Sequence, residues 1–299
     1  MFRILRIDGG SLWTTGHEKV KLQTRLPPSN SRTALIAVRT ILFYRILAFN
    51  RDSCHCIHAV LPLCRKGAQL NVQAKEIQGQ SLLYLAVEPD NYDPDAEYPV
   101  VILLHGYGAS MSDLAGLSAS IHSTGYVFIF PNAPIPMQVG LGTTGYAWTP
   151  PQDSGTEEDE VNSQEMLEIL FDEVQERYNV EGGNILLGGF SQGGMMTYRC
   201  GLTRPDLFAG LLILSSRLPT DAAISDNLPE DRNQPIFVAH GTSDMMISVN
   251  DARRSREFLE SEGYAPEYHE YEMGHEINQA VIDDMVVWLG SVLPPGPEN

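Results

Sequence analysis

The sequence has few cysteines and lacks long apolar runs, and both shortages limit what the protein can be. Only four cysteines occur among 299 residues, and one of them, Cys200, lies beyond residue 69. A lone cysteine cannot form an internal disulfide, so the larger part of the chain needs no oxidising compartment. No apolar run reaches 18 residues, which argues against a transmembrane helix. These absences predict a cytoplasmic protein without stable membrane insertion.

Basic residues are scarce as well, and they are unevenly distributed. The chain has 20 Lys and Arg against 38 Asp and Glu, a formal net charge of −18. Residues 1–69 hold eleven basic and three acidic residues, which gives +8, whereas residues 70–299 hold nine and 35, which gives −26. A surface that acidic repels phosphate backbones and anionic headgroups. We therefore expect no nucleic-acid partner for the larger part.

Residues 1–69 are predicted to be a poorly ordered basic extension, because they show no sustained strand or helix periodicity. An amphipathic targeting segment and translated upstream sequence that the fold does not need are the open alternatives. The extension contains a cluster of potential zinc ligands: Cys54, His55, Cys56, His58 and Cys64. Their spacing fits no usual C-x2–4-C pair, so we predict no metal site.

From residue 70 onward, short apolar runs alternate with helix-like segments. The expected strands cover 82–87, 100–104, 127–130, 185–187, 211–214, 236–239 and 267–271. The expected helices cover 163–177, 195–202, 251–261 and 277–289. Continuous apolar strands between helices predict an α/β domain, with a mostly parallel sheet covered on both faces. Ligands bind at the carboxyl ends of such strands, so functional residues should follow them directly.

The strongest motif follows the expected strand 185–187. Gly189, Ser191 and Gly193 form G-x-S-x-G between this strand and a helix. A serine in such a tight turn adopts strained backbone angles, and the flanking glycines relieve the crowding. The next helix N-terminus favours developing negative charge. We interpret Ser191 as a catalytic nucleophile.

A serine hydroxyl needs a general base, and in folds with this motif the order along the chain is serine, acid, histidine. Only His240, His269 and His275 follow Ser191. His240 ends the expected strand 236–239, so too little chain lies between Ser191 and His240 for an acid on an intervening strand. His269 lies within an expected strand. His275 follows that strand in a loop, and is therefore the predicted base.

The predicted acid is Asp244, which follows the expected strand 236–239 at the same edge of the sheet. It would hold the His275 imidazole in the correct tautomer. Other acids in this interval lie in polar loops or at a helix start and are interpreted as solvated surface charge: Asp221, Asp226, Asp231 and Asp251.

An oxyanion hole is the remaining requirement for acyl transfer. The N–H of Gln192, directly after the nucleophile, is one predicted donor, and the loop 105–110 should supply the other. Glycines at 106 and 108 let that loop turn sharply. His105 and His240, which both precede a glycine at a strand end, are interpreted as structural histidines.

Taken together, the motifs resemble the phospholipase/carboxylesterase family, which includes the acyl-protein thioesterases. Five blocks occur in that family's order: 104–108, 131–134, 189–194, 240–244 and 273–275. The resemblance implies an α/β-hydrolase domain over 70–299 that cleaves carboxylic esters or thioesters, as a carboxylesterase, lysophospholipase or acyl thioesterase. It implies no cofactor and an acyl-enzyme on Ser191, and makes Tyr107 the second oxyanion donor.

The sequence departs from the family pattern near the expected pocket. Met245 stands where proline usually follows the acid, and Ser216 and Arg217 stand where smaller or aromatic residues are common. Candidate substrate-binding residues are Trp148, Phe190 and Met246, with ordinary core packing as the alternative for the last two. A homodimer and the identity of the small-molecule ester or thioester stay open.

Two alternative functions are less favoured. A dienelactone-hydrolase-like or peptidase-like relative could share the fold, because fold does not determine substrate. The first typically uses a cysteine nucleophile, and the second usually has an added domain. An inactive hydrolase fold serving as a binding module is opposed by the intact set of Ser191, Asp244 and His275.

Overall fold

A computed structural model describes residues 73–89, 92–122, 124–140, 142–150, 157–219, 224 and 227–296. All of them belong to one compact unit, His58–Asn299. The predicted extension over residues 1–69 lies outside the described residues, and so does its cysteine and histidine cluster. The predicted order of this segment and the boundary at residue 70 therefore stay predictions.

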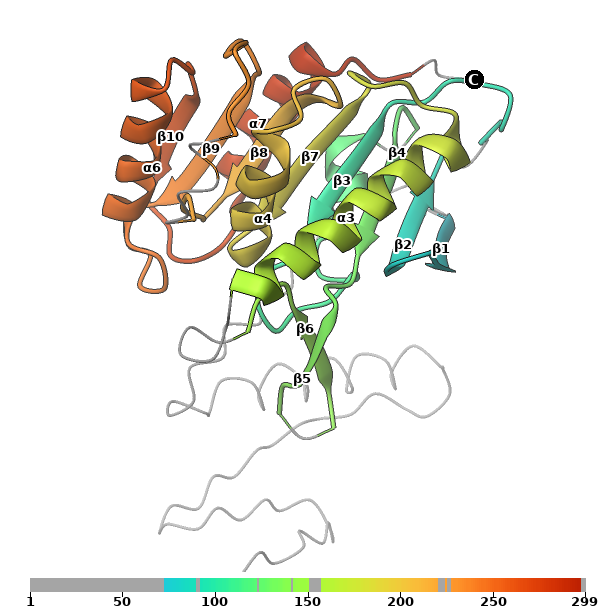
Figure 1. Cartoon of the computed structure of the whole chain (residues 1–299), viewed down its shortest axis with the longest axis horizontal. Coiled ribbons are helices and arrows are strands. Elements are labelled where there is room, and N and C mark those ends of the chain that lie inside the picture. The colour runs from blue at the N-terminus through green and yellow to red at the C-terminus, as the bar shows by residue number, and fades with distance from the viewer. Residues whose placement is uncertain are drawn as a thin grey trace, which may run out of the picture. The chain divides into compact units, whose positions relative to one another are not determined.

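The unit is built on an eight-stranded sheet with the order β1-β2-β4-β3-β7-β8-β9-β10 (Figure 1). The strands are β1 Gln73–Gln78, β2 Leu83–Glu88, β3 Val100–Leu104, β4 Val127–Pro131, β7 Ile185–Phe190, β8 Phe208–Leu214, β9 Ile236–Gly241 and β10 Glu267–Tyr271. Within this sheet, as far as the structure describes it, the pairs β1–β2 and β2–β4 are antiparallel and the other neighbours run parallel. The predicted mostly parallel sheet is confirmed.

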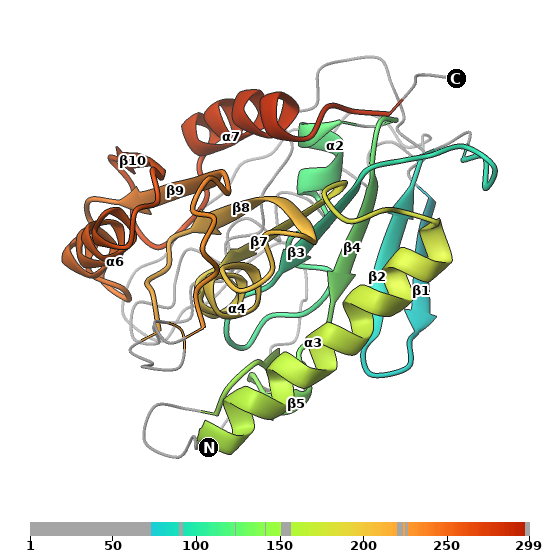
Figure 2. The same cartoon turned by 45° about the horizontal axis from the view of Figure 1, so that its top comes forward.

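Helices cover both faces of the sheet, as the apolar strands require. They are α2 Leu117–Ile121, α3 Glu157–Tyr178, α4 Gln192–Gly201, α6 Val249–Ser261 and α7 Gln279–Val292. Successive side chains of β3 point to opposite faces. Val100, Ile102 and Leu104 pack in the cluster that includes residues of α3, α4 and α6, whereas Val101 and Leu103 pack with residues of α2 and α7. The two groups of helices lie on opposite faces of the sheet (Figure 2).

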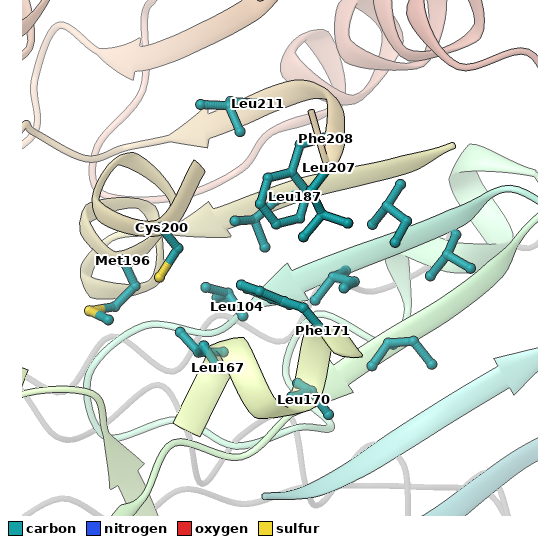
Figure 3. Close-up of a cluster of buried hydrophobic side chains, with 14 of the residues drawn as sticks. Leu104, Leu167, Leu170, Phe171, Leu187, Met196, Cys200, Leu207, Phe208 and Leu211 are labelled. Carbon is teal, nitrogen blue, oxygen red and sulfur yellow. The ribbon is translucent and has the colours of Figure 1, made fainter. Parts of the chain in front are cut away.

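The larger cluster is densely packed against α3 and α4 (Figure 3). The rings of Phe171 on α3 and Phe208 on β8 meet edge to face, with centroids 5.1 Å apart. Leu104, at the carboxyl end of β3, is fully buried in the same cluster. The strand ends that hold the candidate site therefore rest on a rigid core.

Four elements were not expected from the sequence: the edge strand β1, the short helix α2, and the strands β5 Ile135–Gln138 and β6 Thr144–Ala147, which form a hairpin. β1 lies at the edge of the sheet and pairs only with β2. Its sequence is mostly polar, so the apolar run that marks a central strand is missing. The hairpin contacts the loop after β3 through a bridge between Ala109 and Tyr146. The hairpin therefore contacts the loop that is expected to supply an oxyanion donor.

Among the helices within the described ranges, none is long and apolar enough to cross a bilayer.

Candidate active site

Ser191 occupies a strained turn between β7 and α4. Its φ of 55° and ψ of −117° lie where non-glycine residues are rarely found. Neither motif glycine has room for a side chain. A Cβ at Gly189 would lie 2.3 Å from Gly193, and a Cβ at Gly193 would lie 2.1 Å from the Leu104 carbonyl oxygen. The close approach of α4 to β7 thus explains Gly189, and its close approach to β3 explains Gly193.

His275 lies within hydrogen-bonding distance of Ser191. Its Nε2 is 2.9 Å from Ser191 Oγ, and its Nδ1 is 2.7 Å from Asp244 Oδ2. The Phe190 ring packs against the imidazole, with centroids 4.8 Å apart. The imidazole side chain is 14% exposed, so a substrate can reach it while three neighbours limit its motion.

Asp244 is fully buried and surrounded by hydrogen-bond donors. Its Oδ1 accepts from the N–H groups of Met246 and Ile247 at 2.8 and 2.9 Å. Its Oδ2 faces His275 and also lies 3.5 Å from Nε2 of His240. The two backbone N–H groups fix Oδ1, and the His275 ring fixes the position of Oδ2. The turn after β9 therefore holds Asp244 in a single orientation toward His275.

The loop after β3 lies directly beside Ser191. A Cβ added at Gly106 would lie only 3.3 Å from Ser191 Cβ, so a side chain there would crowd the candidate nucleophile. Among the described residues, neither the Tyr107 N–H nor the Gln192 N–H donates a hydrogen bond to a backbone acceptor. The oxyanion role that the sequence predicts for these two N–H groups stays a prediction, with which this absence is compatible.

The buried ring of His105, at the start of this loop, is held by two contacts with the backbone. Its Nε2 accepts from the Ala133 N–H at 3.1 Å, and its Nδ1 faces the Gly106 carbonyl oxygen at 2.7 Å. Burial lowers the pKa of His105 to about 4, so the ring is neutral at pH 7. Its interpretation as a structural histidine agrees with these contacts.

Trp148 and the Gln192 side chain connect the loop to the hairpin. The Trp148 indole N–H donates to the His105 carbonyl at 2.9 Å, and its backbone N–H donates to Gln192 Oε1 at 2.8 Å. Gln192 Nε2 in turn donates to the carbonyl of Thr149 at 2.9 Å. The Gly108 N–H donates to the Tyr146 carbonyl at 2.9 Å. The sequence did not indicate this role for Gln192, since only its backbone was considered.

The three candidate pocket residues lie in different environments. Trp148 is fully buried, so within the described structure it can act on a substrate only through the loop that it supports. Phe190 is partly buried against His275, and Met246 is 68% exposed beside Asp244. Met245, which stands where the family usually has proline, is more exposed still, at 93%.

The two other histidines that follow Ser191 in the chain, His240 and His269, have structural surroundings. His240 is fully buried, and its Nε2 lies 2.9 Å from the Ile247 carbonyl. His269 belongs to β10, next to Glu267 at 3.0 Å. Within the described part of the chain, no group of three or more His, Cys, Asp or Glu residues is arranged to hold a metal ion.

The chain is similar to several known proteins. The family model described as phospholipase/carboxylesterase matches residues 91–292. Acyl-protein thioesterase 1 of Mycosarcoma maydis is 30% identical over 218 residues, which cover 65% of this chain and 91% of that protein. Two crystal structures share the fold. Esterase PE8 has a TM-score of 0.61 at 22% identity and covers 74% of this chain and 100% of its own. The Bacillus cereus carboxylesterase has a TM-score of 0.59 at 18% identity and covers 71% of this chain and 95% of its own.

Proposed function

The chain belongs to the phospholipase/carboxylesterase family, and we propose that it hydrolyses carboxylic esters or thioesters through an acyl-enzyme on Ser191. One observation carries the proposal: Ser191 Oγ, the His275 ring and Asp244 Oδ2 form a continuous series of contacts at 2.9 and 2.7 Å. This is the arrangement in which a serine hydroxyl can be deprotonated as it attacks.

In the first half of the reaction, Ser191 Oγ attacks the substrate carbonyl carbon while His275 Nε2 takes the hydroxyl proton. The imidazolium then gives that proton to the departing alcohol or thiol as the bond to the carbonyl carbon breaks. The acyl group stays on Ser191. Asp244 keeps the proton on Nδ1, so that Nε2 is the atom free to accept, and it stabilises the transient imidazolium.

In the second half, water replaces the leaving group. His275 Nε2 takes a proton from the water as its oxygen attacks the acyl-enzyme carbonyl, and returns that proton to Ser191 Oγ as the carboxylic acid leaves. In both halves the tetrahedral oxyanion accepts hydrogen bonds from the Tyr107 and Gln192 N–H groups. The N-terminus of α4, which begins at Gln192, adds favourable electrostatic potential there.

We assign Phe190 and Met246 to the apolar wall of the acyl site. Phe190 lies against the base, and Met246 is an exposed flexible side chain beside the acid, a type that adapts to irregular apolar groups. Trp148 acts on the same site indirectly, by supporting the loop that contains Tyr107. A cytoplasmic location is part of the proposal, supported by the lone buried cysteine of the larger part, Cys200.

The test is turnover of two matched series, p-nitrophenyl esters and acyl thioesters of increasing chain length, by the full-length protein and by Ser191→Ala. We expect wild-type hydrolysis in at least one series, and stoichiometric labelling of Ser191 by a fluorophosphonate. Binding of these compounds without turnover or labelling would instead support the inactive binding module.

Chain-length preference tests the acyl site separately. Met246→Ala should change the relative rates of short and long acyl chains, whereas Val287→Ala should leave them unchanged. Val287 is a similarly exposed apolar residue of α7, at 75% against 68% for Met246, and provides the matched control. Identical selectivity profiles for both variants would remove Met246 from the acyl site.

A further inference from the structure

Directly after β8, two adjacent buried serines donate hydrogen bonds to backbone carbonyls next to the candidate nucleophile and base. The Ser216 hydroxyl donates to the carbonyl oxygen of Ser191 at 2.7 Å. The Ser215 hydroxyl donates to the carbonyl oxygen of Glu276, the residue after His275, at 3.1 Å. Neither side chain is exposed.

From these contacts we infer that Ser215 and Ser216 are positioning residues that set the distance between Ser191 and His275. The inference rests on the proposed function and adds to it two residues that position the reacting groups. The Ser215–Ser216 pair touches neither substrate nor reacting atoms, and acts through the backbone of the two residues that do.

Ser216 acts on the strained backbone of Ser191. A conformation such as φ 55° is costly for a residue other than glycine and persists only where surrounding contacts determine it. Here the Ser191 N–H donates to the Leu214 carbonyl at 2.9 Å, and the Ser191 carbonyl accepts from both Met195 N–H and Ser216 Oγ. Loss of the Ser216 hydroxyl leaves the Ser191 carbonyl with its weaker contact, at 3.2 Å to Met195.

Ser215 acts on the loop that contains His275. It too has a left-handed backbone, with φ 46°, and its N–H donates to the Ala239 carbonyl at 2.8 Å. That bond attaches it to the end of β9 while its hydroxyl reaches Glu276. Three residues at one strand end, 214–216, thus hold both the nucleophile and the loop of the base.

The pair also explains a local requirement for glycine. A Cβ at Gly194 would lie 2.5 Å from Ser216 Cβ and 2.8 Å from its Oγ. Ser216 can therefore reach the Ser191 carbonyl only because position 194 has no side chain. The sequence marked Ser216 as a departure from the family pattern, and its hydrogen bond gives that departure a physical role.

The experiment compares steady-state kinetics and fluorophosphonate labelling rates of the full-length wild type, Ser215→Ala and Ser216→Ala. A displacement of about 1 Å between reacting groups costs on the order of 100-fold in rate. We expect each variant to lower kcat and the labelling rate by roughly tenfold to 100-fold, with KM within about threefold of wild type. A kcat within about twofold of wild type in both variants would overturn the inference.

Ser118→Ala is the matched control. Ser118 on α2 is also buried and also donates its hydroxyl to a backbone carbonyl, that of Ala115 at 2.7 Å. Its substitution should cost stability without lowering kcat. An equal loss of kcat in Ser118→Ala would show that the effect is general destabilisation, and would count against the inference.

Two further variants separate the hydroxyl from strain and from folding. Ser215→Gly relieves the positive φ but also removes the hydroxyl, so it should be as slow as Ser215→Ala; wild-type activity in Ser215→Gly would contradict the inference. Ser216→Cys preserves volume with a weaker donor and should be intermediate. If the wild type itself neither turns over nor labels, the proposed function fails. If the wild type turns over and labels, and the variants do so at the same rates, the proposed function stands and only this inference fails.

Discussion

The Nε2 atom of His275 lies 2.9 Å from the hydroxyl oxygen of Ser191, although 84 residues separate them in the chain. β8 and β9 stand between β7 and β10 in the sheet, so the loop after β10 must fold back across β9. It does so over Gly241, where a Cβ would lie 2.3 Å from the Gly274 carbonyl oxygen, and the Ser243 N–H donates to the Met273 carbonyl. This close packing brings the base to the nucleophile.

Ser191→Ala is expected to remain folded and to lose turnover by about 10⁴-fold or more, because no other group can form the acyl-enzyme. Ser261→Ala, an exposed serine at the end of α6, is the control and should be fully active. Turnover and fluorophosphonate labelling are measured on both. Retention of more than about a hundredth of the wild-type rate in Ser191→Ala would refute the assignment of the nucleophile.

Asp244→Asn is expected to reduce kcat on the order of 10⁴-fold with little change in the fold. The amide oxygen can still accept from Met246 and Ile247, but its NH₂ group would then face His275 Nδ1. That contact favours the tautomer whose Nε2 is protonated and cannot accept the serine proton. Kinetics beside a thermal unfolding curve test this, and a loss below about tenfold would contradict the role of Asp244.

Gly193→Ala should destabilise the protein by at least about 3 kcal/mol, since its Cβ would overlap backbone atoms of Leu104 and His105 that cannot move aside. Gly290→Ala in α7 is the matched control. No atom lies within 4 Å of its added Cβ, and alanine is the better helix former, so stability should rise by up to about 1 kcal/mol. Urea unfolding of both variants measures the difference. Equal effects would contradict the close approach of α4 to β3.

His105 should make the free energy of unfolding depend on pH between about 4 and 6.5. Its folded pKa of about 4 lies below the ordinary value near 6.5, so in this window the unfolded chain binds a proton that the folded chain excludes. Stability is therefore expected to fall as the pH is lowered through this window, by at most about 3 kcal/mol. Above about pH 6.5 this contribution is constant.

The comparison is His105→Gln, whose side chain does not titrate. The difference in unfolding free energy between wild type and variant, measured by urea unfolding at several pH values, isolates the histidine from the other groups. We expect the wild type to lose stability more steeply on acidification. Parallel curves for the two proteins would show that His105 takes up its proton equally well in the folded state.

Deletion of residues 1–69 should change the melting temperature by no more than a few degrees and kcat/KM by no more than about threefold. The family match begins at residue 91 and the described strands at Gln73, so the deletion leaves both intact. Truncated and full-length proteins are compared under identical conditions. A large loss of stability would mean that the extension packs on the domain, and a loss of activity alone would place it at the substrate entrance.

Much of the architecture was predictable from local sequence, because buried parallel strands are continuous apolar runs. β3 was placed correctly to the residue, and β7 and β9 to within three residues. The G-x-S-x-G motif located Ser191 in a turn between strand and helix, since few other patterns tolerate that backbone. β1 and the β5–β6 hairpin were missed because their stability comes from pairing, not from composition.

The sequence by itself determined which residue types follow which strands, and thus the candidates Ser191, Asp244 and His275 at one edge of the sheet. Only the tertiary structure decided which atoms meet. The fold of the loop after β10 over Gly241, the contact of Gln192 with Trp148, and the bonds of Ser215 and Ser216 each join segments far apart in the chain. Such contacts depend on strand order and on backbone angles at separate turns acting together. No local pattern encodes them, because a hydrogen bond requires its two partners to be placed within a few tenths of an ångström by the whole fold.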